Sequence, residues 1–128
     1  HRLTTGELEA ATNLHPDIIE CAVIGIPDEI KGEVPIAFVV KKGAKLLDEE
    51  ISSFKKEIIE QIKKEISPIA LPKEIYLVED LPKTRSGKIM RRILRKFFIG
   101  EDLGDLSTLA NPESVENIKK IIKNGVKI

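Results

Sequence analysis

The chain has 128 residues, of which 41% are hydrophobic and 33% charged, with 21 basic and 21 acidic side chains. This composition fits one globular domain and excludes a disordered chain. No apolar run approaches the ~20 residues of a membrane helix and no signal peptide is visible, so the sequence predicts a cytoplasmic protein with no membrane partner. The single cysteine, Cys21, lies in an apolar stretch and is interpreted as a small buried hydrophobe, not a catalytic thiol.

The net charge of zero conceals an uneven distribution along the chain. Between residues 83 and 96 every charged side chain is basic, namely Lys83, Arg85, Lys88, Arg91, Arg92, Arg95 and Lys96. The rest of the chain therefore holds the other 14 basic residues against all 21 acidic ones. A basic window in an acidic body predicts an anionic target. With no tryptophan and one tyrosine, the chain has few stacking surfaces for bases, which disfavours a nucleic-acid-binding module as the alternative.

The first 40 residues predict a helix followed by two strands. Thr4 and Glu7 fit a capping box that starts the helix. Residues 18–26 and 34–40 are rich in β-branched side chains and are separated by a turn, so we expect an antiparallel pair. Pro35, near the start of the second strand, favours an edge position. His15 is expected to be a surface or hydrogen-bonded loop histidine, with no cluster of metal ligands near it.

The rest of the chain predicts three helices and a third strand. Asp48 is expected to cap the clearest helix, whose apolar residues recur at three- and four-residue steps up to residue 66. A strand follows around residues 75–81, then a helix at 91–98 and a tether at 101–110. Asn111 is expected to cap the last helix, with Pro112 as its first residue. The predicted fold is an α+β domain in the order α-β-β-α-β-α-α, with a small, largely antiparallel sheet flanked by helices.

The segment 85–88 (RSGK) lies between the third predicted strand and a helix, where a phosphate-binding P-loop is the first motif to test. That motif requires glycine at position 82 and serine or threonine at 89, but the chain has Pro82 and Ile89, which excludes it. Two interpretations stay open. Lys88 is either presented by a mobile loop to a developing negative charge, with Gly87 freeing the backbone, or it belongs to a solvated helix N-terminus.

Residues 82–92 (PKTRSGKIMRR) resemble the C-terminal signature of adenylate-forming acyl-CoA synthetases, in particular the acetyl-CoA synthetase branch. Three further stretches resemble the same family in the same order, at residues 1–9, 22–32 and 103–112. The resemblance therefore covers nearly the whole chain. Residues 82–92 are highly specific, and the other stretches are weak when taken singly.

The resemblance implies an AMP-forming acetate–CoA ligase, with a propionyl-CoA synthetase as the alternative. In this family a carboxylate attacks ATP to give an acyl-adenylate, the C-terminal domain rotates, and CoA then forms the thioester. Residues 1–100 would be that mobile lid domain and residues 101–128 a tether and helix packed on it. ATP, with magnesium, and CoA would be substrates held mainly by a large N-terminal domain that this chain lacks. The chain alone is therefore expected to lack full activity.

The resemblance also implies roles for residues of the basic window. Lys88 corresponds to the adenylation lysine, which bridges the attacking carboxylate and the phosphates of ATP. Arg85, Ser86 and Gly87 are expected to support the loop, and Gly87 allows its close approach. Lys88 further resembles an acceptor for reversible acetylation, so a lysine acetyltransferase and a deacetylase are implied as partners. Acetylation would remove the charge that adenylation requires.

Two residues outside the window have roles by the same resemblance. Arg2 corresponds to an arginine that contacts the nucleotide phosphate, with a terminal surface residue as the alternative. Lys63 lies where bacterial acetyl-CoA synthetases often carry an arginine close to CoA. Lysine keeps the charge but lacks the planar guanidinium, so a base on a solvated helix end is the alternative for Lys63. No metal site is expected in this chain.

Overall fold

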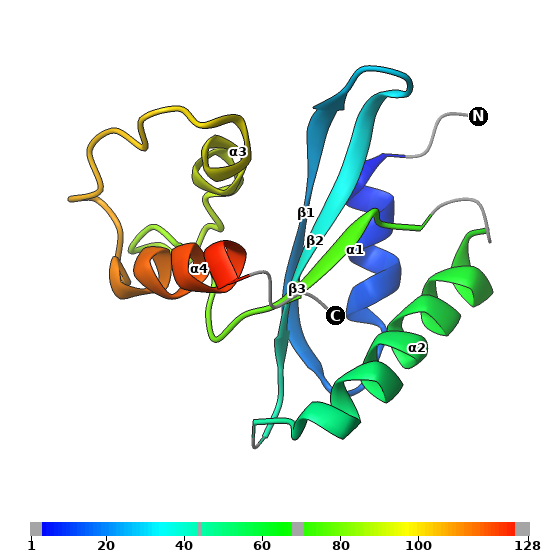
Figure 1. Cartoon of the computed structure of the whole chain (residues 1–128). Coiled ribbons are helices and arrows are strands. Elements are labelled where there is room, and N and C mark those ends of the chain that lie inside the picture. Colours follow the sequence, from blue (N-terminus) through cyan, green and yellow to red (C-terminus); the bar gives the residue numbers. More distant parts are fainter. Residues whose placement is uncertain (1–3, 44, 68–70, 125–128) are drawn as a thin grey trace.

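The seven elements of the structure, a computed structural model that describes residues 4–43, 45–67 and 71–124, follow the predicted order. They are α1 (Thr5–Asn13), β1 (Ile18–Asp28), β2 (Gly32–Lys41), α2 (Asp48–Glu65), β3 (Glu74–Leu77), α3 (Arg91–Ile99) and α4 (Glu113–Asn124). The sheet forms a central layer, with α1 and α2 on one face and α3 and α4 on the other (Figure 1). The predicted α+β class is confirmed. Across the described ranges, no helix combines the length and apolar character that crossing a bilayer demands.

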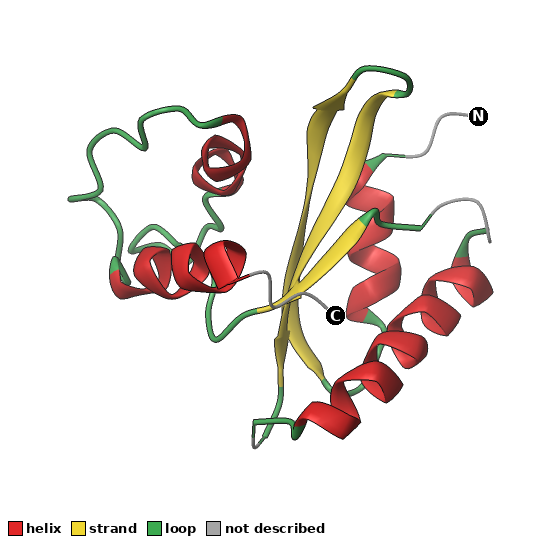
Figure 2. Ribbon diagram, viewed as in Figure 1, coloured by secondary structure: helices red, strands yellow, loops and turns green. Residues whose placement is uncertain are grey.

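The sheet is mixed, and β2 lies in its middle between β1 and β3 (Figure 2). β1 and β2 form an antiparallel hairpin, the longer of the two pairings, which closes where Asp28 lies opposite Gly32. β3 pairs with β2 in parallel, with Ala37 opposite Ile75. A parallel pair needs a crossover connection, and α2 with its flanking loops supplies it.

The central strand β2 is buried on both faces and contributes to two hydrophobic clusters. Ala37 and Val39 belong to the cluster that α1 and α2 cover. Ile36, Phe38 and Val40 belong to the cluster that α3 and α4 cover. Because side chains alternate across a strand, a strand covered on both faces appears in the sequence as one continuous apolar run.

The prediction of an edge position for Pro35 is wrong, because β2 is the central strand. Pro35 lies one residue before the first pair between β2 and β3, which is Ile36 opposite Glu74. Its carbonyl oxygen accepts a hydrogen bond from the Lys73 N–H at 2.8 Å. The proline is tolerated because it stands at the entrance of the parallel ladder instead of inside it.

The starts of α1 and α2 show one confirmed cap and one correction. At α1 the Glu7 N–H donates to the Thr4 hydroxyl at 3.1 Å, as predicted. At α2 the predicted cap, Asp48, is the first helical residue, and Leu47 holds the cap position. The Leu47 N–H donates to the Glu50 carboxylate at 2.9 Å. The apolar Leu47 side chain cannot cap the helix, so the carboxylate of the first turn provides the stabilising contact.

The start of α4 differs from the prediction in a way that affects the functional site. The helix begins at Glu113, one residue after Pro112, and the Asn111 side chain does not cap it. Instead, the Asn111 amide group turns back to the segment 80–83. The helix itself packs through the fully buried Ile118 onto the cluster beneath α3. The division of the chain at residue 100 stays a prediction.

Candidate active-site loop

Residues 84–88 form a closed turn instead of an open loop. The Gly87 N–H donates to the Thr84 carbonyl at 2.9 Å, and the Thr84 N–H donates to the Lys88 carbonyl at 2.9 Å. Lys83 and Ile89 continue this pairing as an antiparallel bridge. Gly87 has a φ of 89°. Together these features describe a three-residue hairpin turn that ends in a bulged glycine.

The hydroxyl groups of the turn stabilise it from within. Thr84 Oγ1 and Ser86 Oγ share a hydrogen bond of 2.9 Å. Thr84 Oγ1 also accepts from the Lys88 N–H at 3.2 Å. All four residues from Arg85 to Lys88 are exposed. The turn therefore has a defined backbone, and it brings these four predicted site residues together at one tip.

Replacing Gly87 with alanine is expected to destabilise the chain by about 1–2 kcal/mol, because an L-residue at this positive φ is strained. A Cβ atom at Gly87 would meet no heavy atom within 4 Å, so the effect is conformational and not steric. Urea unfolding of the two proteins measures the difference. Gly6→Ala, inside α1, is the matched control and is expected to be neutral or stabilising. Equal destabilisation by both changes would refute the strain at Gly87.

Lys83, at the base of the turn, is an anchor. Its Nζ atom lies 2.6 Å from Glu20 Oε1 and 3.3 Å from Asp80 Oδ1. The hydrogen bond to Glu20 raises the pKa of Lys83 above its ordinary value, and the charge of Asp80 adds to this effect. Lys83 therefore ties the segment entering the turn to β1, and its charge is neutralised within the chain.

A second ion pair holds α3, the helix that follows the turn. The Arg91 guanidinium forms a two-bonded ion pair with the Glu9 carboxylate of α1, in which Nε lies 2.8 Å from Oε2. The same Oε2 accepts from the Val23 N–H of β1 at 3.1 Å. Glu9 thus links α1, the edge strand β1 and α3. It also supplies a negative charge to a helix start that is otherwise basic, where the helix dipole favours an acid.

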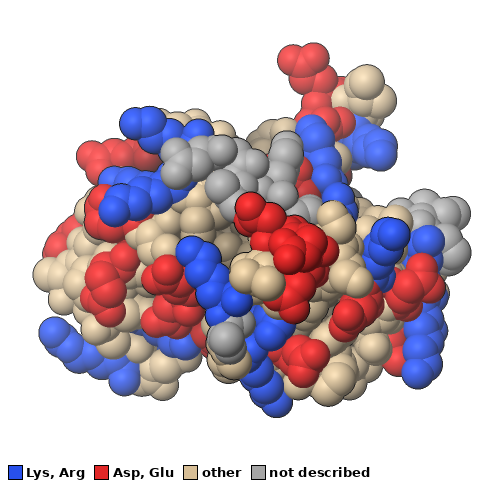
Figure 3. Space-filling model, turned by 60° about the horizontal axis from the view of Figure 1, so that its bottom comes forward, with Lys and Arg blue, Asp and Glu red and all other residues tan. Residues whose placement is uncertain are grey.

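The basic window is therefore not a uniform patch. Lys83 and Arg91 are paired with acidic residues, whereas Arg85 and Lys88 have no acidic partner among the described residues. On the face shown in Figure 3, acidic and basic side chains are interspersed and do not form one field of a single sign. The three basic residues that follow Arg91 on α3 also form no ion pair with the described residues, so Arg85 and Lys88 are distinguished by their place in the turn.

The structure does not bring Lys63 near the turn. Lys63 lies exposed on α2, and its Nζ is 3.7 Å from Glu60 Oε1. α2, which carries Lys63, covers the opposite face of the sheet from α3, the helix that follows the turn (Figure 1). Arg2 lies outside the described residues.

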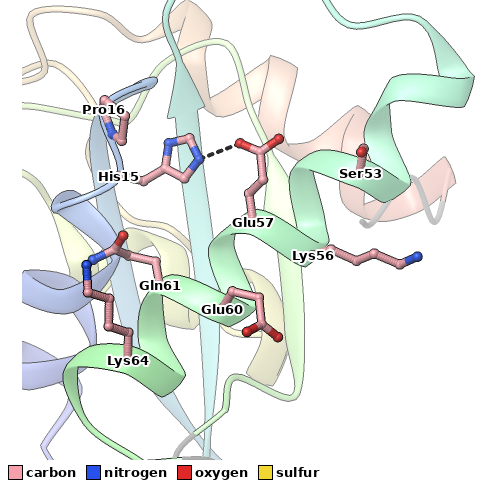
Figure 4. A pocket seen from close by; sticks show the side chains of 8 residues that line it. All are labelled: His15, Pro16, Ser53, Lys56, Glu57, Glu60, Gln61 and Lys64. Carbon is pink, nitrogen blue, oxygen red and sulfur yellow. Dashed lines mark hydrogen bonds and ion pairs between the residues drawn. The ribbon is translucent and has the colours of Figure 1, made fainter.

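His15 is buried, so the prediction of a surface position is wrong and that of a hydrogen-bonded loop histidine is confirmed. Its Nε2 lies 2.7 Å from Glu57 Oε1, and its Nδ1 accepts from the Asp17 N–H at 3.0 Å (Figure 4). The ring also contacts Phe54 edge-on, with centroids 5.3 Å apart.

This arrangement corrects the expectation that no ligand cluster lies near His15, since atoms of His15, Asp17 and Glu57 lie within 4.8 Å of one another. In a neutral imidazole one nitrogen donates and the other accepts. Because Nδ1 accepts the backbone N–H, the hydrogen-bond pattern assigns the proton to Nε2, which donates to Glu57. The ring then has no nitrogen lone pair for a metal ion, so His15 joins α1 to α2 structurally.

Cys21 is 1% exposed, as expected for a buried hydrophobe. Burial raises the pKa of its thiol to about 12, and the charge of Glu9 adds to the rise. The thiolate is therefore not populated near neutral pH, which agrees with a structural role.

The chain belongs to the family described as AMP-binding enzyme C-terminal domain, which matches residues 7–88. The match ends on Lys88, so it includes the whole turn. The resemblance of residues 82–92 to adenylate-forming acyl-CoA synthetases is thereby confirmed.

Several curated relatives that are about half identical to the chain are acetyl-coenzyme A synthetases. It is 51% identical to acetyl-coenzyme A synthetase 1 of Candida albicans over 99% of this chain and 19% of that protein. It is 55% identical to acetyl-coenzyme A synthetase of Pyrobaculum arsenaticum over 94% of this chain and 18% of that protein. Among solved structures, an acyl-CoA synthetase of Brucella canis matches with a TM-score of 0.67 and 37% identity, over 78% of this chain and 18% of that chain. The chain thus spans less than a fifth of the length of these relatives.

Proposed function

We propose that this chain is the C-terminal catalytic domain of an AMP-forming acetate–CoA ligase, and that Lys88 is its adenylation residue. One observation carries the proposal. Lys88 is an exposed lysine with no acidic partner among the described residues, held at the tip of an ordered turn. We propose acetate instead of propionate as the substrate because the relatives are acetyl-coenzyme A synthetases.

The chemistry of the first half-reaction explains why a lysine is needed there. An acetate oxygen attacks the α-phosphorus of ATP, and the bond to the leaving pyrophosphate breaks. Negative charge shifts among the phosphate oxygens as this happens, and a positioned ammonium group stabilises it. The flexible four-carbon stem lets the Lys88 ammonium group reach both the carboxylate and the phosphates. Magnesium enters with ATP as part of the substrate.

The second half-reaction requires a different surface at the same site. The CoA thiol attacks the carbonyl carbon of acetyl-adenylate, the thioester forms and AMP leaves. We propose that the domain rotates between the two steps on a large N-terminal domain that holds ATP and CoA. Lys63, on the opposite face of the sheet, is a candidate for contact with CoA, and Arg2 is a candidate for contact with the nucleotide phosphate. The buried thiol of Cys21 is in keeping with a reducing cytoplasm.

Joining this chain to its large domain tests the proposed function. The product, here called the joined enzyme, is expected to form acetyl-CoA from acetate, ATP and CoA, whereas each part alone is expected to form almost none. Acetyl-CoA is measured by chromatography. If the large domain alone is as fast as the joined enzyme, this chain does not contribute to catalysis.

We propose that acetylation of Lys88 switches off the first half-reaction, with a lysine acetyltransferase and a deacetylase as partners. The exposure of Lys88 supports this, because a modifying enzyme can reach its side chain. An amide at Nζ would remove the positive charge that adenylation uses. Peptide mass analysis after incubation with a lysine acetyltransferase and acetyl-CoA is expected to find the modification on Lys88. Acetylation that spares Lys88 would contradict the proposal, and Lys88→Arg is the control.

A further inference from the structure

We propose that residues 109–111 brace the Lys88 turn and that Asn111 is a positioning residue for adenylation. The inference rests on the proposed function of Lys88. It assigns to the segment after α3 a part in catalysis, although none of its residues lies in the turn.

The Asn111 amide group makes three hydrogen bonds, all to the segment 80–83 that enters the turn. Its Oδ1 accepts from the Lys83 N–H at 2.9 Å. Its Nδ2 donates to Asp80 Oδ2 at 2.8 Å and to the Leu81 carbonyl at 2.7 Å. Burial raises the pKa of Asp80, but the bonds from Asn111 and Leu81 and the charge of Lys83 outweigh it and leave that pKa below its ordinary value. The Asp80 carboxylate is therefore the charged partner that Asn111 holds in place.

The backbone of the same segment runs alongside the turn. The Ala110 N–H donates to the Lys83 carbonyl at 2.9 Å, and Leu109 forms an antiparallel bridge with Thr84. Leu109 is 4% exposed and packs with Ile93 of α3 in a small hydrophobic cluster. The brace is thus anchored in the core and reaches the first residue of the turn.

Rigid positioning of the segment 80–83 matters because a displacement of this segment would also displace the turn and Lys88. Thr84, which the brace contacts, is bonded to Lys88 through its backbone N–H and its hydroxyl. Without the Asn111 side chain, the Lys83 N–H and the Leu81 carbonyl lose a partner, and the segment 80–83 is free to shift. A misplacement of about 1 Å at a reacting group can slow catalysis about 100-fold. Asn111 therefore acts through Lys88 without touching the substrate.

The test compares Asn111→Ala with Asn117→Ala in the joined enzyme. Asn117 is the matched control, because its Oδ1 accepts from the Glu79 N–H at 3.2 Å, one residue before the segment 80–83. Asn111→Ala is expected to lower the kcat of acetate-dependent ATP–pyrophosphate exchange about 10- to 100-fold, while Asn117→Ala leaves it nearly unchanged. Thioester formation from preformed acetyl-adenylate should persist in both variants. Faster hydrogen exchange over residues 84–88 is expected in Asn111→Ala alone.

A reciprocal exchange keeps the test decisive even if Asn111→Ala folds poorly. Asp80→Asn and Asn111→Asp each remove the hydrogen bond between an amide N–H and a carboxylate that joins these two side chains. The double variant restores that bond with donor and acceptor reversed. It is therefore expected to recover part of the rate of ATP–pyrophosphate exchange. Equal loss of both half-reactions, or unchanged ATP–pyrophosphate exchange in Asn111→Ala, would overturn the inference. Lys88→Ala separates the two proposals. If Lys88→Ala retains ATP–pyrophosphate exchange, the proposed function of Lys88 is wrong. If Lys88→Ala loses this activity and the Asn111 variants retain it, only the proposed role of Asn111 is wrong.

Discussion

Lys88→Ala is expected to slow acetate-dependent ATP–pyrophosphate exchange by the joined enzyme about 10²- to 10³-fold. This is the range observed when one preorganised group that stabilises developing charge is removed from an active site. The side chain is exposed and makes no ion pair with the described residues, so its loss leaves the fold intact. The rate is measured with labelled pyrophosphate.

Two further variants show whether the effect belongs to this one lysine. Arg95→Ala removes an exposed base of the same window, on α3, and is expected to change the exchange rate only slightly. Lys88→Arg keeps the charge but replaces a compact ammonium group with a planar guanidinium group, so this variant should be little more active than Lys88→Ala. If Arg95→Ala slows ATP–pyrophosphate exchange as much as Lys88→Ala does, the effect comes from the total positive charge of residues 83–96 and not from Lys88 in particular.

Phe38→Ala is expected to lower the free energy of unfolding by about 3–5 kcal/mol, a large share of the total for a domain of this size. Phe38 is 0% exposed in the central strand. Its ring stacks on Tyr76, with centroids 5.6 Å apart, and contacts Phe98 of α3 at 6.0 Å. Truncation would leave a cavity between the sheet and the layer that includes α3, so urea unfolding should shift to a much lower midpoint.

Ile30→Ala is the matched control for this change. Ile30 lies between β1 and β2 and is 94% exposed, so its truncation removes almost no buried surface. Its effect on unfolding is expected to stay within about 0.5 kcal/mol. If the two changes are equally mild, the cluster beneath α3 and α4 does not stabilise the domain.

The features that the sequence predicted well depend on residues close to one another along the chain. The apolar stripe of α2 is confirmed, with Phe54, Ile58 and Ile62 buried. The hairpin of β1 and β2 is also confirmed, because its turn and its apolar runs are local signals. The charge pattern and the family motif also indicate residues 84–88 as the candidate site, and the role of Lys88 in adenylation stays a prediction.

The features that were missed depend on contacts between distant segments. Asn111 precedes a proline and an apolar helix, which is typical of a helix cap, yet its amide group bonds to a loop segment about 30 residues earlier. The pairing of Glu9 with Arg91 spans 82 residues, and no local pattern indicates it. The central position of β2 likewise depends on β3, which is only four residues long and joins the sheet in parallel. Tertiary contacts determine the orientation of the Asn111 amide group, the Glu9–Arg91 ion pair and the position of β2 in the sheet.

The second half-reaction of the Lys88→Ala enzyme tests the central claim most directly. Preformed acetyl-adenylate and CoA are supplied, and acetyl-CoA formation is followed without any need for ATP. The account predicts that this rate stays within about twofold of that of the unmodified enzyme, because Lys88 serves only the adenylation step. An equal loss of both half-reactions would contradict it.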